Sequence, residues 1–213
     1  MNQIEQIEKY VKVQLATEHS GHGFDHIQRV VRNARLICQQ IPTADGTLVE
    51  MAALLHDVID EKVVADVEQA RQAMVAQLTV IGVSVTRQQA ILTIIEHMSF
   101  VKNIDQQQVL SLEGQIVQDA DRLDAIGAIG IGRTFMYGGA HSGVAYDPQI
   151  EPRAELTATN YREPTTVINH FYEKLFKLAA TMNTPVAKAL ATKRTQVMQA
   201  FVTEYLAEWQ GER

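Results

Sequence analysis

The chain has 213 residues, of which 46% are apolar and 21% are charged, a balance typical of a globular protein with a sizeable core. Its net charge of −6 comes with no block of basic residues, which argues against a nucleic-acid polymer as the main partner. A single cysteine excludes an intramolecular disulfide and fits a reducing compartment.

The ends and the apolar runs of the chain bear on its location. The first residues alternate charged side chains with isoleucine and lack a basic flank followed by an apolar core, so we expect no signal peptide. The longest apolar run, residues 125–132, is too short to span a bilayer and is rich in glycine. We therefore expect a cytoplasmic protein with no membrane partner.

Apolar residues recur at helical spacing, and no segment shows sustained alternation, so we predict an all-α fold. Pro42 to Gly46 breaks the pattern, and Thr184-Pro185 is typical of an N-cap followed by the first residue of a helix. The helices predicted from these patterns lie at about residues 4–15, 27–41, 47–57, 67–81, 86–98, 114–131, 168–182 and 185–209.

Residues 133–165 interrupt the helices with a glycine pair and three prolines. A long irregular stretch inside a compact domain is typical of a functional loop or lid, with a disordered insertion as the alternative. We predict a single domain over residues 1–213, a helical bundle with a core at about 20–130 and C-terminal helices at about 166–210.

Histidines and aspartates recur in three places: residues 22–26, the pair His56-Asp57, and residues 119–124. The pair directly follows an apolar stretch, residues 52–55, and ionisable side chains are rarely buried there without a partner. A divalent metal ion would satisfy these groups together, because imidazole and carboxylate are its usual ligands.

The helical positions of the two histidines favour the metal interpretation. His26 lies one turn before Val30, and His56 lies four residues after Ala52, so both should point along apolar faces toward the core. Either histidine alone would more often be a core residue hydrogen-bonded to backbone. With Asp57 beside His56, a metal ligand becomes the better interpretation.

The third group is interpreted on one helix. Val117, Asp121, Asp124 and Ala128 are spaced by four, three and four residues, so both aspartates should share a face. Two inward carboxylates on one helix repel each other unless a cation or a proton separates them. Asp119 points elsewhere on this helix, and we interpret it as a solvated carboxylate.

These motifs resemble the HD superfamily of metal-dependent phosphohydrolases, an all-α family defined by a His…His-Asp…Asp ligand set. The segments that carry the resemblance lie at residues 22–30, 54–57, 119–128 and 169–175, so it extends over nearly the whole chain. It is most similar to the small bacterial branch that includes nucleotide pyrophosphohydrolases. The resemblance implies that one divalent ion is held by His26, His56, Asp57 and Asp121, with Mn²⁺ or Mg²⁺ favoured and zinc or another transition metal as the alternative.

Three further carboxylates are candidates for catalysis. Asp60 lies one turn after His56 and could orient or deprotonate an attacking water, as could Glu61. For both residues the alternative is a solvated carboxylate at a helix end. Asp124, one turn from Asp121, could hold a ligand or a phosphate-binding residue in place.

Basic and aromatic residues near the motifs are candidates for contacts with an anionic substrate, and for each one a solvated surface side chain is the alternative. These candidates are His22, Lys62, His97, Lys102, Arg122, Arg133, Tyr137 and Lys174. The two histidines could instead hold a second metal ion.

The expected function is a metal-dependent phosphohydrolase that splits a (deoxy)nucleoside triphosphate into monophosphate and pyrophosphate. A nucleoside 5′-monophosphatase, or another hydrolase of small phosphate esters, is the enzymatic alternative because the same ligand set serves both reactions. A nucleotide-binding sensor module without turnover is the non-enzymatic alternative. The expected partner is a small nucleotide or phosphate ester, and a homodimer is left open.

Overall fold

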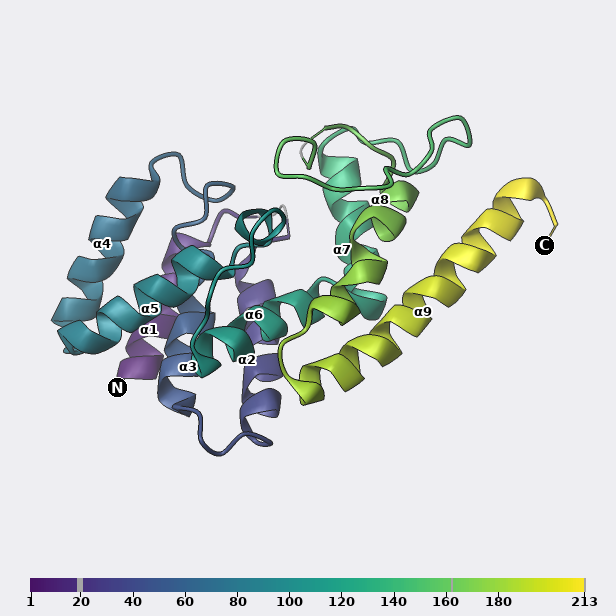
Figure 1. Cartoon of the computed structure of the whole chain (residues 1–213). Coiled ribbons are helices and arrows are strands. Elements are labelled where there is room, and N and C mark those ends of the chain that lie inside the picture. Colours follow the sequence, from purple (N-terminus) through teal and green to yellow (C-terminus); the bar gives the residue numbers. More distant parts are fainter. Residues whose placement is uncertain (19–20, 162, 213) are drawn as a thin grey trace. The chain divides into compact units, whose positions relative to one another are not determined.

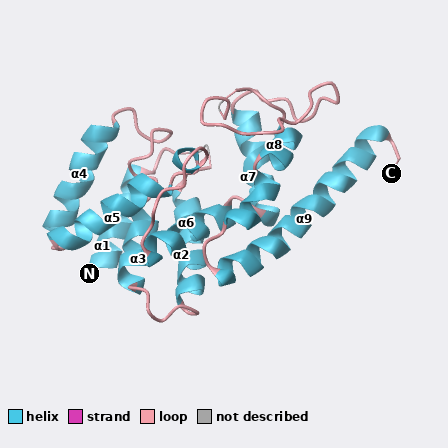
Figure 2. Ribbon diagram, viewed as in Figure 1, coloured by secondary structure: helices cyan, strands magenta, loops and turns pink. Residues whose placement is uncertain are grey.

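The computed structural model describes residues 1–18, 21–161 and 163–212, and over these residues it contains helices and no strands (Figures 1 and 2). The all-α prediction is therefore confirmed. The helices are α1 (Gln3–Gln14), α2 (Phe24–Cys38), α3 (Gly46–Leu55), α4 (Val67–Val80), α5 (Val85–Met98), η1 (Val101–Asn103), α6 (Leu112–Asp124), α7 (Gly127–Ala140), α8 (Val167–Glu173), η2 (Leu175–Thr181) and α9 (Pro185–Gln210).

The chain forms two compact units, an N-terminal unit over Met1–Asp121 and a C-terminal unit over Arg122–Arg213. The boundary between them falls inside α6. The expected single domain over the whole chain stays a prediction. Within the described residues, no helix combines the length and the apolar character that crossing a membrane requires.

Helix α3 is the central element of the N-terminal unit and packs against α1, α2 and α5. Its N-terminus is capped by Asp45, whose carboxylate accepts a hydrogen bond of 3.0 Å from the backbone N–H of Leu48. Every residue from Met51 to Leu55 is buried, as expected for a helix that is apolar on all sides. Because His56 and Asp57 follow directly, α3 delivers them into the interior of the unit.

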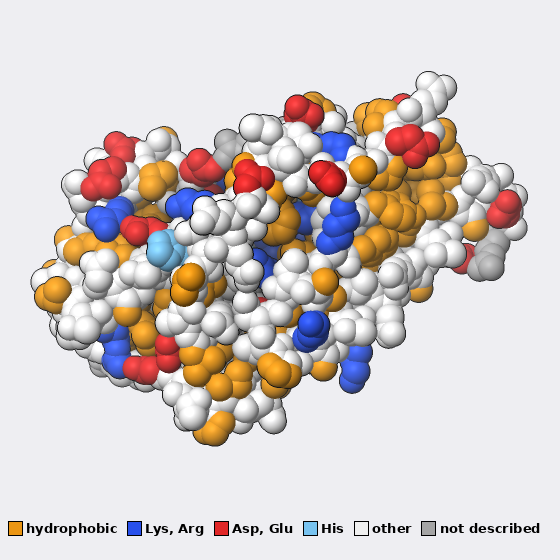
Figure 3. Space-filling model, in the orientation of Figure 1, with side chains coloured by type: hydrophobic (Ala, Val, Ile, Leu, Met, Phe, Trp, Pro, Cys, Tyr) orange, Lys and Arg blue, Asp and Glu red, His pale blue; other side chains and the backbone are white. Residues whose placement is uncertain are grey.

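In the C-terminal unit, α9 packs against α7 and η2. It begins as predicted, with Thr184 as N-cap and Pro185 at its first position. An aromatic cluster joins α7 to α9, with the Phe135 and Phe201 ring centroids 5.9 Å apart. On the face drawn in Figure 3, hydrophobic side chains gather over this unit beside α9.

The helix predicted over residues 114–131 is wrong, because the structure has two helices there. Helix α6 ends at Asp124, and α7 begins at Gly127, whose φ of 79° is left-handed and cannot continue an α-helix. Asp124 and Ala128 therefore do not share a helix face. Asp119 is completely buried, so its interpretation as a solvated carboxylate is also wrong.

The irregular segment is shorter than predicted, because residues 133–140 belong to α7 and the segment starts at His141. The glycine pair of the predicted irregular segment lies inside α7 and does not end it. A Cβ at Gly138 would lie 2.5 Å from Cγ2 of Val167, so the missing side chain allows α7 to approach α8 closely. The glycine serves helix packing here.

A buried ion pair ties the irregular segment to α8. The side chain of Glu173 is fully buried and accepts hydrogen bonds from the backbone N–H of Arg153 at 3.0 Å and from its guanidinium at 2.5 Å. Thr165 donates a third at 3.0 Å. Burial alone would raise the pKa of Glu173, but the hydrogen bonds from Arg153 and Thr165 hold this pKa below its ordinary value. The segment is thus anchored at Arg153.

Candidate metal centre

The C-terminal end of α3 fixes His56. This residue is the C-cap of the helix, and its ring Nδ1 lies 2.9 Å from the backbone oxygen of Ala53. Because a carbonyl can only accept a hydrogen bond, Nδ1 carries the proton and Nε2 keeps its lone pair in the neutral ring. A backbone carbonyl that selects the tautomer in this way is typical of metal-ligating histidines.

His26 comes from the first turn of α2 and is almost completely buried. Its Nε2 lies 3.2 Å from Nε2 of His56, so two ring nitrogens from different helices face one point. Sequence patterning predicted both inward orientations correctly.

Two carboxylates complete the group. Asp57 places Oδ2 3.4 Å from Nε2 of His26 and Oδ1 3.3 Å from Nε2 of His56. Oδ1 of Asp121 lies 3.4 Å from Nε2 of His26 and 3.8 Å from Nε2 of His56. The side chain of Asp57 is nearly buried, whereas that of Asp121 is 37% exposed, so the group opens toward solvent on the side of Asp121.

The position of Asp121 depends on two buried amides that hold α6 against its neighbours. Asn33 of α2 donates a hydrogen bond of 3.1 Å to the carbonyl of Ala120, and Gln118 donates one of 3.0 Å to the carbonyl of Met98 at the end of α5. Both amides are buried, so these bonds also satisfy polar groups that would otherwise be costly. They fix the turn of α6 that carries Asp121.

The group fits a divalent cation. Ligand atoms about 2.1 Å from one ion lie roughly 3.0–3.4 Å from their neighbours, close to the separations measured here. The lone pair of His56 also faces carboxylate oxygens, an arrangement that needs a cation or additional protons between them. The atoms of His26, His56 and Asp121 all lie within 4.8 Å of one another. These residues could hold a metal ion.

Asp57 is held in its charged form. Burial alone would raise its pKa, but interactions with the imidazoles of His56, His22 and His26 hold the pKa of this carboxyl well below its usual range. A carboxylate must be ionised to bind a metal, so its surroundings favour the form that ligates.

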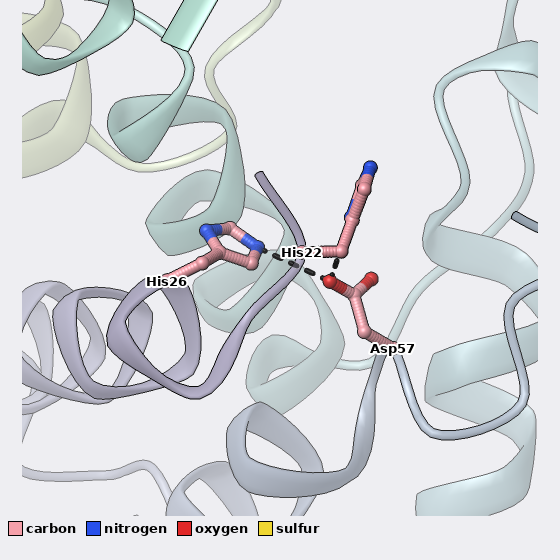
Figure 4. A group of neighbouring side chains, drawn as sticks. All are labelled: His22, His26 and Asp57. Carbon is pink, nitrogen blue, oxygen red and sulfur yellow. Dashed lines mark hydrogen bonds and ion pairs between the residues drawn. The ribbon is translucent and has the colours of Figure 1, made fainter. Parts of the chain in front are cut away.

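His22 also belongs to this group. Its Nδ1 lies 2.9 Å from Oδ2 of Asp57, and its ring stands edge-on to that of His26 with centroids 5.9 Å apart (Figure 4). His22, His26 and Asp57 form a second set of potential ligand atoms within 4.8 Å. Sequence reasoning selected His22 as a substrate contact and missed its contact with the carboxylate.

The candidate residues after α3 lie in a turn. Oδ1 of Asp60 accepts a hydrogen bond of 2.8 Å from the backbone N–H of Lys62, which stabilises the turn. Asp60 is partly exposed, whereas Glu61 and Lys62 are exposed. Their roles in catalysis and substrate binding stay predictions.

Two further candidates lie at the end of α5. His97 is partly exposed, and its Nδ1 is a buried atom with no hydrogen-bond partner among the described residues. Lys102 is exposed, and its Nζ donates a hydrogen bond of 3.0 Å to the carbonyl of Glu96. The roles of both side chains as substrate contacts stay predictions.

The remaining candidates belong to the C-terminal unit, and two of them pair with each other. Arg133 donates a hydrogen bond of 2.8 Å to Oδ2 of Asp124, which is almost fully buried. Arg122 is buried as well and donates a bond of 2.5 Å to the carbonyl of Thr181. In this structure all three side chains make contacts within their own unit.

The last two candidates of this unit are aromatic or contact an aromatic ring. The ring of Tyr137 is half-exposed and stacks on that of His141 with centroids 4.0 Å apart. Nζ of Lys174 donates a hydrogen bond of 2.9 Å to the hydroxyl of Tyr161 and lies 5.1 Å from its ring centroid.

Similarity to known proteins shows the family of the chain. The HD domain family model matches residues 23–126, a range that contains His26, His56, Asp57 and Asp121. A protein of Lactobacillus plantarum of solved structure is 51% identical, with a TM-score of 0.89 and coverage of 98% of this chain and 97% of that one. An HD-superfamily hydrolase from Bacillus thuringiensis is 39% identical, with a TM-score of 0.76 and coverage of 97% and 96%.

Bacillus subtilis YpgQ is a further relative, and its crystal structure in complex with ADP gives a TM-score of 0.76 at 33% identity over 96% of each chain. Aligned by sequence, YpgQ is 38% identical over 205 residues, which span 96% of this chain and 92% of YpgQ. Similarity of this extent covers nearly the whole of both proteins. The chain belongs to the HD-domain superfamily of hydrolases.

Proposed function

We propose that this protein is a metal-dependent phosphohydrolase that splits a (deoxy)nucleoside triphosphate into the monophosphate and pyrophosphate. The observation that carries the proposal is the convergence of His26, His56, Asp57 and Asp121, with ligand atoms 3.2 to 3.8 Å apart. Family membership supports hydrolysis as the reaction class.

The ligand set favours Mn²⁺ or Mg²⁺. Two imidazoles and two carboxylates leave coordination positions open, and the two carboxylates of this mixed set suit these ions. When bound, such an ion polarises a phosphoryl oxygen and lowers the pKa of a water.

The chain's own residues have separate tasks in this proposal. His26 and His56 bind through Nε2, and the carbonyl of Ala53 keeps His56 in the ligating tautomer. Asp60, with Glu61 as the alternative, accepts the proton of the attacking water. Proton transfer of this kind contributes roughly 10²–10⁴-fold to the rate.

The nucleotide part of the proposal is supported by YpgQ, whose crystal structure contains ADP. A ligand with an adenosine and two phosphates is consistent with a substrate of the same class. Lys62, His97 and Lys102 are the proposed phosphate contacts in the N-terminal unit, because each places a basic side chain at the end of a helix or in the turn after one.

Product analysis tests the proposal. Metal-depleted protein is supplied with Mn²⁺ and a panel of nucleoside mono-, di- and triphosphates in water enriched in ¹⁸O, and the products are separated by ion exchange. Cleavage of the α–β linkage gives monophosphate and pyrophosphate, and the labelled product identifies the attacked phosphorus. Orthophosphate as the sole phosphate product would identify the phosphatase, and nucleotide binding without turnover would identify the sensor module.

Two variants control this assay. Asp57→Ala removes a ligand that touches both histidines and should abolish turnover and metal retention together. Asp25→Ala is the matched change, since Asp25 lies at the start of α2 with 73% of its side chain exposed and pairs with Arg29. It should leave both properties unchanged.

A further inference from the structure

His22 makes a contact that its selection as a substrate residue does not explain. Its Nδ1 lies 2.9 Å from Oδ2 of Asp57, the shortest contact between charged or ionisable groups that the structure records for this carboxylate. Only 16% of the His22 side chain is exposed, and 7% of that of Asp57. The contact is therefore shielded from solvent. A hydrogen bond to a charged group is stronger in such a shielded place than in water.

The local backbone is suited to placing this ring. Gly21 has a φ of 105°, a left-handed value that favours glycine. A Cβ at Gly23, the N-cap of α2, would lie 2.9 Å from Oδ1 of Asp25 and 3.1 Å from the carbonyl of Glu18. A side chain at Gly21 would strain the backbone, and one at Gly23 would require the side chain of Asp25 and the carbonyl of Glu18 to give way.

The geometry assigns the proton of this contact. A carboxylate that binds a metal ion is ionised and can only accept a hydrogen bond, so Nδ1 of His22 donates, and the other ring nitrogen points away from the carboxylate (Figure 4). Asp57 meanwhile directs both of its oxygens toward His26 and His56. A carboxylate that faces two ligands can still rotate about its Cβ–Cγ bond, and the hydrogen bond from His22, which is not one of the four proposed ligands, restrains that rotation.

We propose that His22 is a positioning residue of the metal centre, which donates from Nδ1 to Asp57 and holds its carboxylate in the orientation that binds the ion. The inference rests on the metal site of the proposed function. Hydrogen-bond partners that orient a ligand typically change metal affinity about 10- to 100-fold when they are removed.

Two amides separate the positioning role from other roles of the ring. In asparagine the side-chain nitrogen occupies the place of Nδ1, whereas in glutamine it reaches the place of Nε2. Mn²⁺ affinity and stoichiometry are measured without nucleotide, from the electron paramagnetic resonance signal of free Mn²⁺, for the full chain and for His22→Ala, His22→Asn and His22→Gln. Asp25→Asn, an exposed change in the same segment, is the matched control.

The expected result is Mn²⁺ binding that weakens about 10- to 100-fold in His22→Ala and His22→Gln and is restored in His22→Asn, with unchanged stoichiometry. Unchanged affinity in the alanine variant would overturn the proposal. An asparagine variant that binds Mn²⁺ as weakly as the alanine variant does would also overturn it. The loss of one equivalent of bound Mn²⁺ in both of these variants would identify His22 as the ligand of a second ion. A glutamine variant that keeps Mn²⁺ affinity and alters only KM would make it a substrate contact.

The metal titration tests the role of His22, and the turnover assay tests the proposed function. If wild-type protein binds Mn²⁺ with the expected dependence on residue 22 but hydrolyses no nucleotide, the role of His22 stands and the proposed function falls. If wild-type protein retains no Mn²⁺, both proposals are overturned. Far-ultraviolet circular dichroism of each variant shows whether a change in affinity arises with the helices intact.

Discussion

The ion pair between Arg153 and Glu173 gives a quantitative prediction for stability. Arg153→Met keeps the length of the side chain but removes the guanidinium that donates at 2.5 Å to a carboxylate with no exposed surface. Removing one partner of a buried pair typically costs about 3–5 kcal/mol. Because 20% of the Arg153 side chain reaches solvent, and the backbone N–H and Thr165 still donate, we expect about 2–3 kcal/mol.

Urea unfolding measures this cost. Circular dichroism reports the helices, and the fluorescence of Trp209, the single tryptophan, reports the C-terminal unit, where its ring contacts Tyr146. With a urea slope of about 2 kcal/mol/M, the midpoint should fall by roughly 1–1.5 M. The matched control is Arg35→Met, which breaks an Arg–Glu pair whose arginine is 59% exposed and should cost at most about 1 kcal/mol.

The double variant Arg153→Met/Glu173→Gln refines the test. Glutamine keeps an oxygen that accepts from the backbone N–H of residue 153 and from Thr165, and it removes the unpaired buried charge, so the double variant should recover part of the lost stability. The reasoning is refuted if Arg153→Met unfolds at the same urea concentration as Arg35→Met, or if the double variant is no more stable than the single one.

Three other predictions follow from the metal centre and from a partly buried histidine. Addition of Mn²⁺ at about 100 times its dissociation constant should raise the free energy of unfolding by about 2.7 kcal/mol, and Asp57→Ala should abolish this increase; a variant that kept it would contradict the ligand assignment. Asp60→Asn should lower kcat by about 100-fold or more at unchanged Mn²⁺ affinity, and wild-type kcat would exclude Asp60 as the base. Burial and the charge of Lys174 lower the pKa of His170 to about 3, so its contribution to stability is complete above about pH 6.5 and is lost as the pH falls toward 3. In chelator, wild-type protein should therefore lose up to about 1.4 kcal/mol per pH unit more than His170→Gln over this range, and parallel curves would refute the prediction.

The sequence predicted the inward orientation of His26 and His56 because both lie in or directly after helices of simple periodicity. The inward orientation of His26 follows from the apolar stripe of α2, and that of His56 from the apolar helix α3. What patterning could not supply is the partner of each side chain. The hydrogen bond from His56 to Ala53 had a readable signal, since the two residues are one turn apart at a helix end. The contact of His22 with Asp57 joins residues 35 positions apart and had none.

Each error in prediction has a physical origin in the structure. Asp119 was interpreted as solvated because an amphipathic helix has one wet face, but the residues from Ile116 to Ala120 are all buried, so this part of α6 has none. The glycine pair at residues 138–139 was interpreted as part of an irregular segment, whereas the role of a glycine differs with its position. Gly127 separates two helices through its left-handed backbone, and Gly138 lies inside a helix because Val167 leaves no room for a Cβ.

All five side chains of the candidate metal centre come from the first 121 residues, since His22, His26, His56, Asp57 and Asp121 belong to the N-terminal unit. Substitutions, insertions or recombination in the rest of the chain therefore replace none of the proposed ligand atoms. A protein built in this way can vary its C-terminal unit and keep every residue of the candidate metal centre. The same division recommends the C-terminal unit for engineering, because libraries of variants there begin with the ion-binding atoms already in place.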